Sequence, residues 1–127
     1  MQDGAHVILC IDDDHIVREG LKEILEMDGH HVEIAESGKE GIKIFDSEKR
    51  KAQGFNVVFT DLGMPEMDGW EVAKEIKSKA PDTPVILLSG WGNLMNGSEV
   101  ADKAVDEVLG KPPKIKDLRR VLHKVLS

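Results

Sequence analysis

Residues 7–14 read VILCIDDD, in which five apolar residues are followed at once by three carboxylates. An unbroken apolar run of this length, rather than an alternating one, is typical of a strand that helices cover on both faces. Comparable runs recur along the chain, separated by longer segments with helical spacing. This order predicts an α/β fold of repeated strand–helix units on a parallel sheet. We expect five strands, over residues 6–11, 31–35, 56–60, 84–88 and 106–109.

Cap and stripe patterns predict where the helices lie. Residues 37–40 have the spacing of a capping box, and Asp68 with Glu71 offers a similar helix start. A shorter helix with few apolar residues is expected over 96–103. The last helix has the clearest apolar stripe, formed by Ile115, Leu118, Leu122 and Val125.

Size and composition limit the classes of protein to consider. The 127 residues suffice for one domain over residues 1–127, and we expect no output domain within them. A formal net charge of −7 argues against nucleic-acid binding, which needs Lys and Arg against phosphates. We read no signal peptide and no membrane span, and the lone Cys10 lies inside the first apolar run. A cytoplasmic location is therefore expected.

Polar residues stand at the ends of the later apolar runs, as the acidic triplet 12–14 does at the end of the first. They are Asp61, Ser89 and Lys111. The carboxyl ends of parallel strands share one edge of a sheet, and ligands bind there, so we expect these side chains to converge. Carboxylates, a hydroxyl and an ammonium on one rim predict a metal-assisted phosphoryl site.

Asp61 is the candidate nucleophile of that site. A carboxylate that attacks a phosphoryl group approaches a centre that is already negative, so a divalent cation is needed, and Mg²⁺ suits carboxylate ligands. We expect Asp13 and Asp61 to hold Mg²⁺, with Asp12 acting through a bound water. The backbone carbonyl of Gly63 would complete the ligands that the protein supplies.

Two further groups would hold the phosphoryl oxygens. The Lys111 ammonium and the Ser89 hydroxyl would each contact one of them, so that the reaction depends on positioning and charge stabilisation. The product would be an acyl phosphate on Asp61. Its added charge, roughly −1.5 to −2, would draw the hydroxyl and its loop inward.

Four segments of the chain resemble the receiver domain of bacterial two-component response regulators. They are residues 7–14, 57–69 (VVFTDLGMPEMDG), 84–90 (PVILLSG) and 110–112 (GKP). The likeness covers nearly the whole chain, with the same order and similar spacing. It implies a flavodoxin-like (βα)₅ fold, with a five-stranded parallel sheet in the order 2-1-3-4-5 and helices on both faces.

The resemblance also implies a role for each site residue. Asp61 matches the phosphoacceptor, and Asp12 and Asp13 match the acidic pair, with Asp13 as the direct Mg²⁺ ligand. Ser89 matches the switch hydroxyl and Lys111 the lysine that contacts the phosphate. The phosphoryl donor would be a phosphohistidine on a sensor histidine kinase or a histidine phosphotransfer protein.

Other properties follow from the resemblance alone. The Lys111–Pro112 peptide bond would be cis. The fourth helix, the last strand and the last helix would form the face that docks a downstream protein target or a second copy of the chain. The protein would then be a monomer or a phosphorylation-dependent dimer that binds neither nucleic acid nor membrane directly.

Two departures from the family pattern bear on mechanism. Many receivers have an aromatic residue three positions before the lysine, and Val108 stands there, so an aromatic rotamer switch is not expected. Gly63 and Trp91 hold positions that flank the path of the hydrolysing water. Since neither can orient that water, we expect a comparatively long-lived acyl phosphate, partly covered by Trp91.

Three other functions fit the sequence less well. A small metal-dependent phosphohydrolase with an Asp nucleophile has similar residues, but it needs an acid–base carboxylate that Gly63 does not provide. A flavodoxin-like cofactor binder lacks a Ser/Thr/Gly-rich loop after the first strand, and no Gly-x-x-x-x-Gly-Lys sequence suggests a nucleotide triphosphatase. A signalling module, rather than an enzyme acting on a separate substrate, fits the sequence best.

Overall fold

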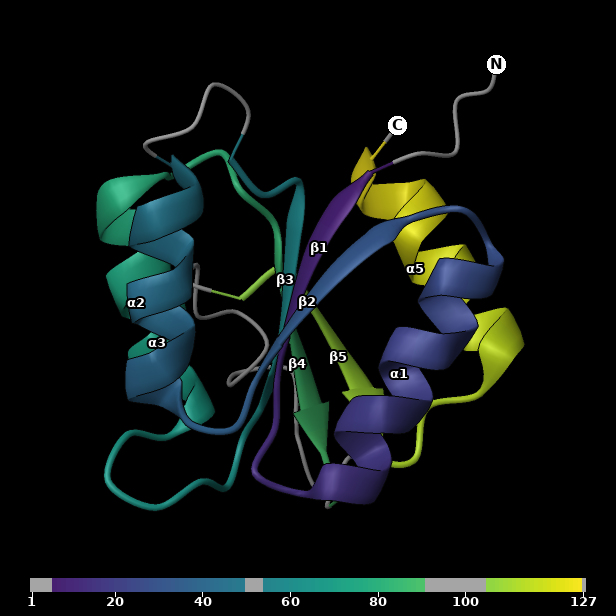
Figure 1. Cartoon of the computed structure of the whole chain (residues 1–127), viewed down its shortest axis with the longest axis horizontal. Helices are drawn as coiled ribbons and strands as arrows, with labels where there is room; N and C mark the ends of the chain where they lie inside the picture. The colour runs from purple at the N-terminus through teal and green to yellow at the C-terminus, as the bar shows by residue number, and fades with distance from the viewer. Residues whose placement is uncertain (1–5, 50–53, 91–104, 127) are drawn as a thin grey trace.

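The computed structural model describes residues 6–49, 54–90 and 105–126. Five parallel strands form one sheet in the order β2-β1-β3-β4-β5 (Figure 1). Their bounds are Val7–Ile11 for β1, His31–Ala35 for β2, Val57–Asp61 for β3, Val85–Ser89 for β4 and Glu107–Gly110 for β5. The predicted α/β class and the predicted strand order are both confirmed.

Helices cover both faces of this sheet. Figure 1 shows α1 and α5 on one face and α2 and α3 on the other. Their bounds are His15–Met27 for α1, Gly38–Lys49 for α2, Gly69–Lys79 for α3 and Ile115–Leu126 for α5. The predicted helix over 96–103 and the predicted role of Trp91 lie outside the described residues.

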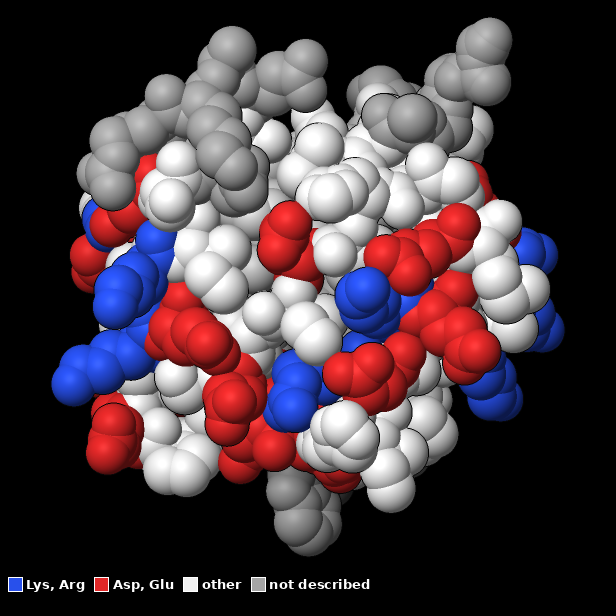
Figure 2. Space-filling view, viewed as in Figure 1, with Lys and Arg blue, Asp and Glu red and all other residues white. Residues whose placement is uncertain are grey.

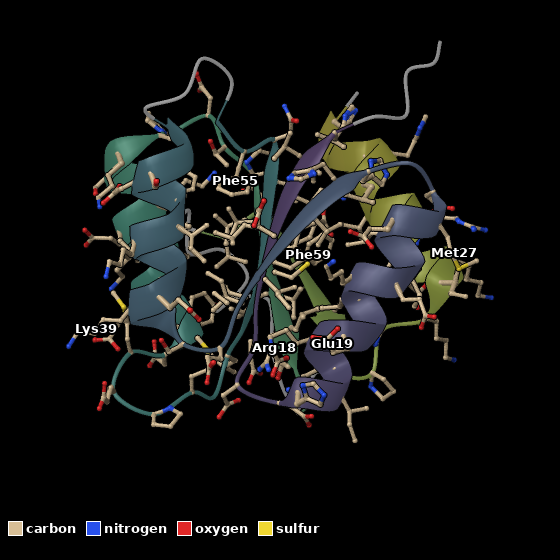
Figure 3. The ribbon with its side chains drawn as sticks, in the orientation of Figure 1. Arg18, Glu19, Met27, Lys39, Phe55 and Phe59 are labelled. Carbon is tan, nitrogen blue, oxygen red and sulfur yellow. The ribbon has the colours of Figure 1, made fainter. Side chains whose placement is uncertain are left out.

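Two layers of apolar side chains explain the unbroken runs in the sequence. Alternate strand residues point to opposite faces, so a strand between two helix layers buries every side chain. Phe55 packs in the layer beneath α2 and α3, and Phe59 packs in the layer beneath α1 and α5 (Figure 3). Cys10 belongs to the second layer and is fully buried on β1.

Strands β3 and β4 extend one residue further at their carboxyl ends than the strands predicted from their apolar runs. Asp61 is the last residue of β3, and Ser89 is the last residue of β4. The backbone ladder continues past the apolar residues, since the Leu62 N–H donates to the Leu88 carbonyl at 2.8 Å and the Lys111 N–H donates to the Ser89 carbonyl at 3.1 Å. The backbones of Asp61 and Ser89 are therefore held by the middle of the sheet.

The helix caps agree with the sequence patterns in all but one detail. Asp68 and Glu71 form a complete capping box at the start of α3. At the start of α2 the Ser37 hydroxyl accepts from the Glu40 N–H at 3.1 Å, but the Glu40 carboxylate accepts from the Glu36 N–H at 2.7 Å. At the start of α2 the Glu40 carboxylate therefore reaches the Glu36 amide, one residue before the Ser37 amide that a capping box would use.

One predicted member of the last helix's apolar face is wrong. Ile115 is 45% exposed, and the buried residues of α5 are Leu118, Val121 and Leu122. The face that packs on the sheet therefore begins one turn into the helix. Residues three and four positions apart form that face, as a helical period requires.

Charge is spread over the surface in both signs. Lys and Arg are interspersed with Asp and Glu on the face of the molecule that Figure 2 shows. Within the described part of the chain, the helices are too short and too polar for any of them to cross a lipid bilayer.

Candidate metal and phosphoryl site

A hollow of about 450 Å³ opens at the carboxyl ends of β1, β3, β4 and β5. The sheet order puts β1 beside β3, where the chain reverses its direction of winding, and this is the place where open α/β sheets bind ligands. The hollow is lined by Asp13, Asp14, Asp61, Leu62, Gly63, Ser89, Gly90 and Lys111. The convergence that the sequence predicted is therefore present.

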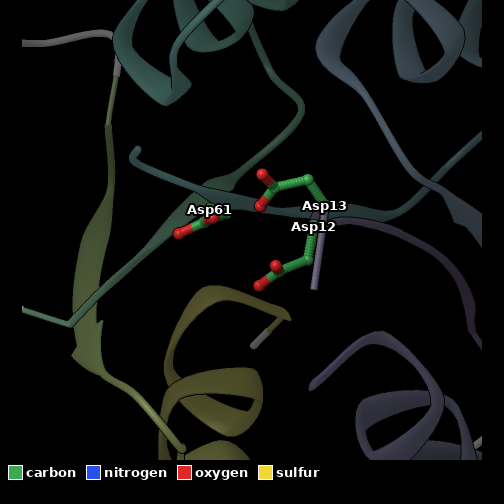
Figure 4. Close-up of side chains that lie close together, drawn as sticks. All are labelled: Asp12, Asp13 and Asp61. Atoms are coloured by element: carbon green, nitrogen blue, oxygen red, sulfur yellow. The ribbon is translucent and has the colours of Figure 1, made fainter. Parts of the chain in front are cut away.

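Three carboxylates meet in this hollow. Asp12 and Asp13 follow β1, Asp61 ends β3, and one oxygen of each lies within 4.8 Å of the other two. Figure 4 shows the three side chains pointing toward a shared space. Asp12 is fully buried and Asp61 is 5% exposed, whereas Asp13 faces solvent. Among the described residues this is the only group of three metal-ligating side chains so placed.

The Asp12 carboxylate is half satisfied. Its Oδ1 accepts from the Asp14 N–H at 2.8 Å, whereas its buried Oδ2 has no hydrogen-bond donor within the described chain. The Lys111 ammonium lies 3.2 Å from Oδ2, close enough for an ion pair. A buried charged oxygen without a donor is costly. The arrangement fits a hydrated cation, because a bound water would supply the missing donor.

One ammonium group stands between the two buried acids. Lys111 Nζ is 3.1 Å from Asp61 Oδ1, in addition to its contact with Asp12. Burial acts to lower the pKa of Lys111, but its contacts with the two carboxylates outweigh burial, so its pKa is raised. Lys111 therefore stays protonated and positively charged at the floor of the hollow.

Burial raises the pKa values of the two buried carboxyls, Asp12 and Asp61. It raises the pKa of Asp61 to about 6, with the Asp12 charge adding to the effect and Lys111 opposing it. Burial also raises the pKa of Asp12, against the Asp14 N–H and Lys111. Both groups favour a neighbouring positive charge for this reason, since a cation stabilises their ionised forms.

Asp14 has the role of a helix cap. Its side chain accepts from the Ile16 N–H at 2.9 Å and from the Val17 N–H at 3.4 Å, at the start of α1. With that carboxylate engaged by the helix, Asp12 and Asp13 are the members of the triplet that join Asp61.

The loop after β3 is held against the site by a close backbone approach. A Cβ added to Gly69 would lie 2.5 Å from the Asp61 carbonyl oxygen and 2.9 Å from the Leu62 Cα. Only a residue without a side chain allows α3 to start so near β3. This role of Gly69 was not predicted from the sequence.

The remaining predicted residues also lie at the hollow. Gly63 is exposed and has open space around its Cα, and Ser89 is 1% exposed at the end of β4. The Lys111–Pro112 bond is cis, as expected. Arg18 was missed altogether: its Nη1 donates to the Asp12 carbonyl oxygen at 3.0 Å.

A second hollow of similar volume lies at the other end of the sheet. It holds about 460 Å³ between the end of α1 and α5, and His6 and His30 stack in it with ring centroids 5.6 Å apart. The His6 N–H donates to His30 Nδ1 at 3.2 Å, so that nitrogen is not free to bind a metal. The three-carboxylate hollow is the stronger candidate for chemistry.

Comparison with known proteins gives the same family for nearly the whole chain. The sequence model of the response regulator receiver domain matches residues 8–123. Response regulator MprA of Mycolicibacterium vanbaalenii is 32% identical over 119 residues, which are 94% of this chain and 49% of that protein. The chain spans about half the length of the curated relatives it matches.

Solved structures agree with the sequence comparison. A response regulator receiver domain protein from Clostridium thermocellum superposes with a TM-score of 0.84 at 34% identity, covering 95% of this chain and 94% of that one. The response regulator TrrA from Thermotoga maritima, in complex with Mg²⁺ and BeF, has a TM-score of 0.81 at 33% identity, covering 94% of this chain and 98% of that one. The chain belongs to the response regulator receiver domain family.

Proposed function

We propose that Asp61 of this receiver domain accepts a phosphoryl group from a phosphohistidine, carried by a sensor histidine kinase or a histidine phosphotransfer protein. The observation that carries the proposal is the meeting of Asp12, Asp13 and Asp61 beside the Lys111 ammonium in one open hollow. Three acids and one base leave an excess of negative charge there, which suits a cation more than a free anion.

The residues present fit Mg²⁺. Asp13 and Asp61, with the Gly63 carbonyl, would bind it directly, and the buried Asp12 would act through a water. When bound, Mg²⁺ neutralises phosphoryl oxygens and so lowers the repulsion that the attacking carboxylate meets. The TrrA structure contains Mg²⁺ together with BeF, which supports the assignment for this chain.

The chain's own residues would act as follows. An Asp61 oxygen forms a bond to phosphorus while the bond from phosphorus to the donor imidazole breaks, and the imidazole nitrogen keeps the electron pair. Lys111 already lies 3.1 Å from Asp61, so its ammonium is placed to contact a transferred oxygen. Ser89, at the end of the neighbouring strand β4, would donate a hydrogen bond from its hydroxyl to another phosphoryl oxygen.

Phosphorylation would be read out through the change of charge at Asp61. The added charge of about −1.5 to −2 in a nearly buried site draws donors toward it. We propose that the altered face includes β5 and α5 and that it docks a separate protein target or a second copy of the chain. Val108 on β5 leaves no aromatic side chain to rotate there.

A macromolecular phosphoryl donor is supported by apolar surface beside the hollow. Ile16 in the first turn of α1 is 79% exposed. A groove of about 230 Å³ runs from this turn to Pro112 and Pro113 on the loop that carries Lys111. A small-molecule donor would not need such a surface, whereas a protein donor would bury it.

The proposal extends to the scope of the domain. We treat residues 1–127 as one receiver domain of the cytoplasm that catalyses only its own phosphorylation and dephosphorylation. The lone, buried Cys10 and the net charge of −7 support a reduced compartment and a protein partner rather than DNA. The alternative of a phosphohydrolase is not favoured, because the exposed Gly63 offers no acid–base group.

Incubation with acetyl phosphate and Mg²⁺ tests this function. Wild type should gain a single phosphoryl adduct, detected by intact mass, and Asp61→Asn should gain none. Asp82→Asn, at an exposed position before β4, is the matched control and should be modified like wild type. A wild type that gains no adduct, or an adduct that persists in Asp61→Asn, would contradict the proposal.

A further inference from the structure

Arg18 connects α1 to the backbone of the acidic pair. Its Nη1 donates to the Asp12 carbonyl oxygen at 3.0 Å, and that carbonyl belongs to the peptide that joins Asp12 to Asp13. Arg18 lies on the part of α1 nearest the carboxyl ends of the strands (Figure 3). The contact is partly buried, and so it is shielded from competition by water.

The guanidinium is itself held in place. Its Nη2 lies 3.3 Å from His15 Nδ1, and since arginine has donors only, that nitrogen must be the acceptor. The planar fork of Arg18 therefore contacts two groups at once, the exposed His15 ring and the Asp12 carbonyl. A flexible ammonium could not hold both in one geometry.

Fixing this peptide has a consequence for Asp13. The Asp12 carbonyl and the Asp13 amide share one rigid plane, so a contact that sets the direction of the carbonyl also sets where the Asp13 Cα lies. Asp12 is already fixed on the side-chain side, since its Oδ1 accepts from the Asp14 N–H. Asp13 is exposed, so the position of its carboxylate depends strongly on the backbone that carries it.

We propose that Arg18 is a positioning residue for the metal site, which holds the exposed Asp13 carboxylate in its place through the Asp12–Asp13 peptide. This inference rests on the proposed function, because it concerns the affinity of the same site for Mg²⁺. Groups that support metal ligands from behind are worth about 10- to 100-fold in metal affinity. Loss of Arg18 should therefore weaken Mg²⁺ binding by about tenfold, at the low end of that range.

The experiment compares Arg18→Gln with Arg119→Gln. Both variants lose a guanidinium and one positive charge, but Arg119 contacts Asp28 at 2.9 Å, beyond the far end of α1. With 13 residues at about 1.5 Å each, α1 separates the two places by roughly 20 Å. Mg²⁺ affinity is measured by calorimetry, and the ¹⁵N shift of the Asp13 amide is measured in the metal-free proteins.

The expected result is an Mg²⁺ dissociation constant about ten times higher in Arg18→Gln and unchanged in Arg119→Gln. The Asp13 amide shift should move only in Arg18→Gln. A merely stabilising role for Arg18 would change the melting temperature without moving the Asp13 shift or the affinity.

Three outcomes would overturn the inference. Equal Mg²⁺ affinity in wild type and Arg18→Gln is one, and equal weakening in both variants, which would assign the effect to net charge, is another. Full restoration by Arg18→Lys is the third, because charge alone would then suffice. A wild type that takes up no Mg²⁺ would instead refute the proposed function, and the two failures are therefore distinguishable.

Discussion

Lys111 Nζ lies 3.1 Å from Asp61 Oδ1, although β4 lies in the sheet between β3, which Asp61 ends, and β5, which Lys111 follows. The contact is made over the carboxyl end of β4, which ends at Ser89. The Lys111 side chain therefore connects the loop after β5 to the end of β3 across the floor of the hollow. Its positive charge lies between two buried carboxylates and offsets their mutual repulsion.

Replacing Lys111 with Met should harm both stability and phosphorylation. Asp12 and Asp61 would face each other without the cation between them, and breaking a largely buried charge pair costs about 2–3 kcal/mol of unfolding free energy. Loss of one group that stabilises transferred charge should slow phosphorylation by acetyl phosphate about 100-fold. Urea unfolding at pH 7 and the rate of adduct formation measure the two effects.

Lys77→Met is the control for this prediction. The side chain of Lys77 has the same exposed fraction, 18%, and its ammonium donates to the Thr83 carbonyl and to Asp106. Its loss should reduce stability while phosphorylation proceeds at nearly the wild-type rate. Equal rates in Lys111→Met and Lys77→Met would show that Lys111 has no part in the transfer.

The stability of the metal-free protein should depend on pH through Asp61. Burial raises its pKa to about 6 from an ordinary value of 3.8, so the folded state binds the proton more tightly than the unfolded state. The resulting stabilisation is fully present below pH 4 and is lost as the pH rises through 6, which amounts to about 2 kcal/mol. Urea unfolding in EDTA between pH 4 and pH 7 measures the loss.

The difference between wild type and Asp61→Asn isolates this effect from other titrations. Burial lowers the pKa of His30, so its protonation destabilises the fold as the pH falls, but it does so in both proteins. The wild type should therefore lose stability relative to Asp61→Asn as the pH rises. A relative stability that is flat, or that increases with pH, would contradict the raised pKa of Asp61.

Gly69→Ala should be destabilising because the new Cβ has no room. It would lie 2.5 Å from the Asp61 carbonyl oxygen and 2.6 Å from Leu87 Cδ1, so the start of α3 must shift at a cost of about 2 kcal/mol. Gly20→Ala is the matched control, since nothing lies within 4 Å of its new Cβ in the middle of α1. That change should stabilise the protein by about 0.5–1 kcal/mol.

Phosphorylation gives Gly69→Ala a second readout. The shift at the start of α3 would move the Asp61 backbone, so adduct formation should slow in Gly69→Ala and not in Gly20→Ala. If thermal melting instead shows the two alanine variants to be equally stable, the close approach of Gly69 does not constrain the loop.

Mg²⁺ should stabilise the wild type and should not stabilise Asp13→Asn. A ligand that binds only the folded state at ten times its dissociation constant adds about 1.4 kcal/mol to the free energy of unfolding. Asp13→Asn removes the exposed member of the three carboxylates, whereas Asp117→Asn, in the first turn of α5, leaves the site intact. Melting temperatures with and without Mg²⁺ should rise for wild type and Asp117→Asn only.

Much of the fold could be predicted from the sequence, because buried strands leave unbroken apolar runs. Hydrophobicity did not predict where β3 and β4 end, because each strand includes one polar residue after its apolar run. Asp61 pairs in register with Leu88, although it is charged, since strand pairing needs only the backbone groups. Ile115 was placed wrongly for a related reason: a stripe shows which side of a helix is apolar and not where the sheet beneath it begins.

The site was predictable where chemistry depends on residue type at a strand end, as for Asp12, Asp13 and Asp61. It was not predictable where the contribution is geometric. Gly69 acts through a side chain that it lacks, and Arg18 acts on a carbonyl six residues earlier, across the turn into α1. Neither contact leaves a pattern in composition or spacing.

The complete burial of Cys10 makes thiol labelling a measure of local opening of the core. Burial, reinforced by the Asp12 charge, raises the pKa of this thiol far above its ordinary value, so the native protein presents almost no thiolate to an alkylating reagent. The Cys10 side chain packs in the apolar layer beneath α1 and α5, so labelling requires these helices to separate from the sheet. The labelling rate thus measures how often the helix layer beside the acidic pair opens.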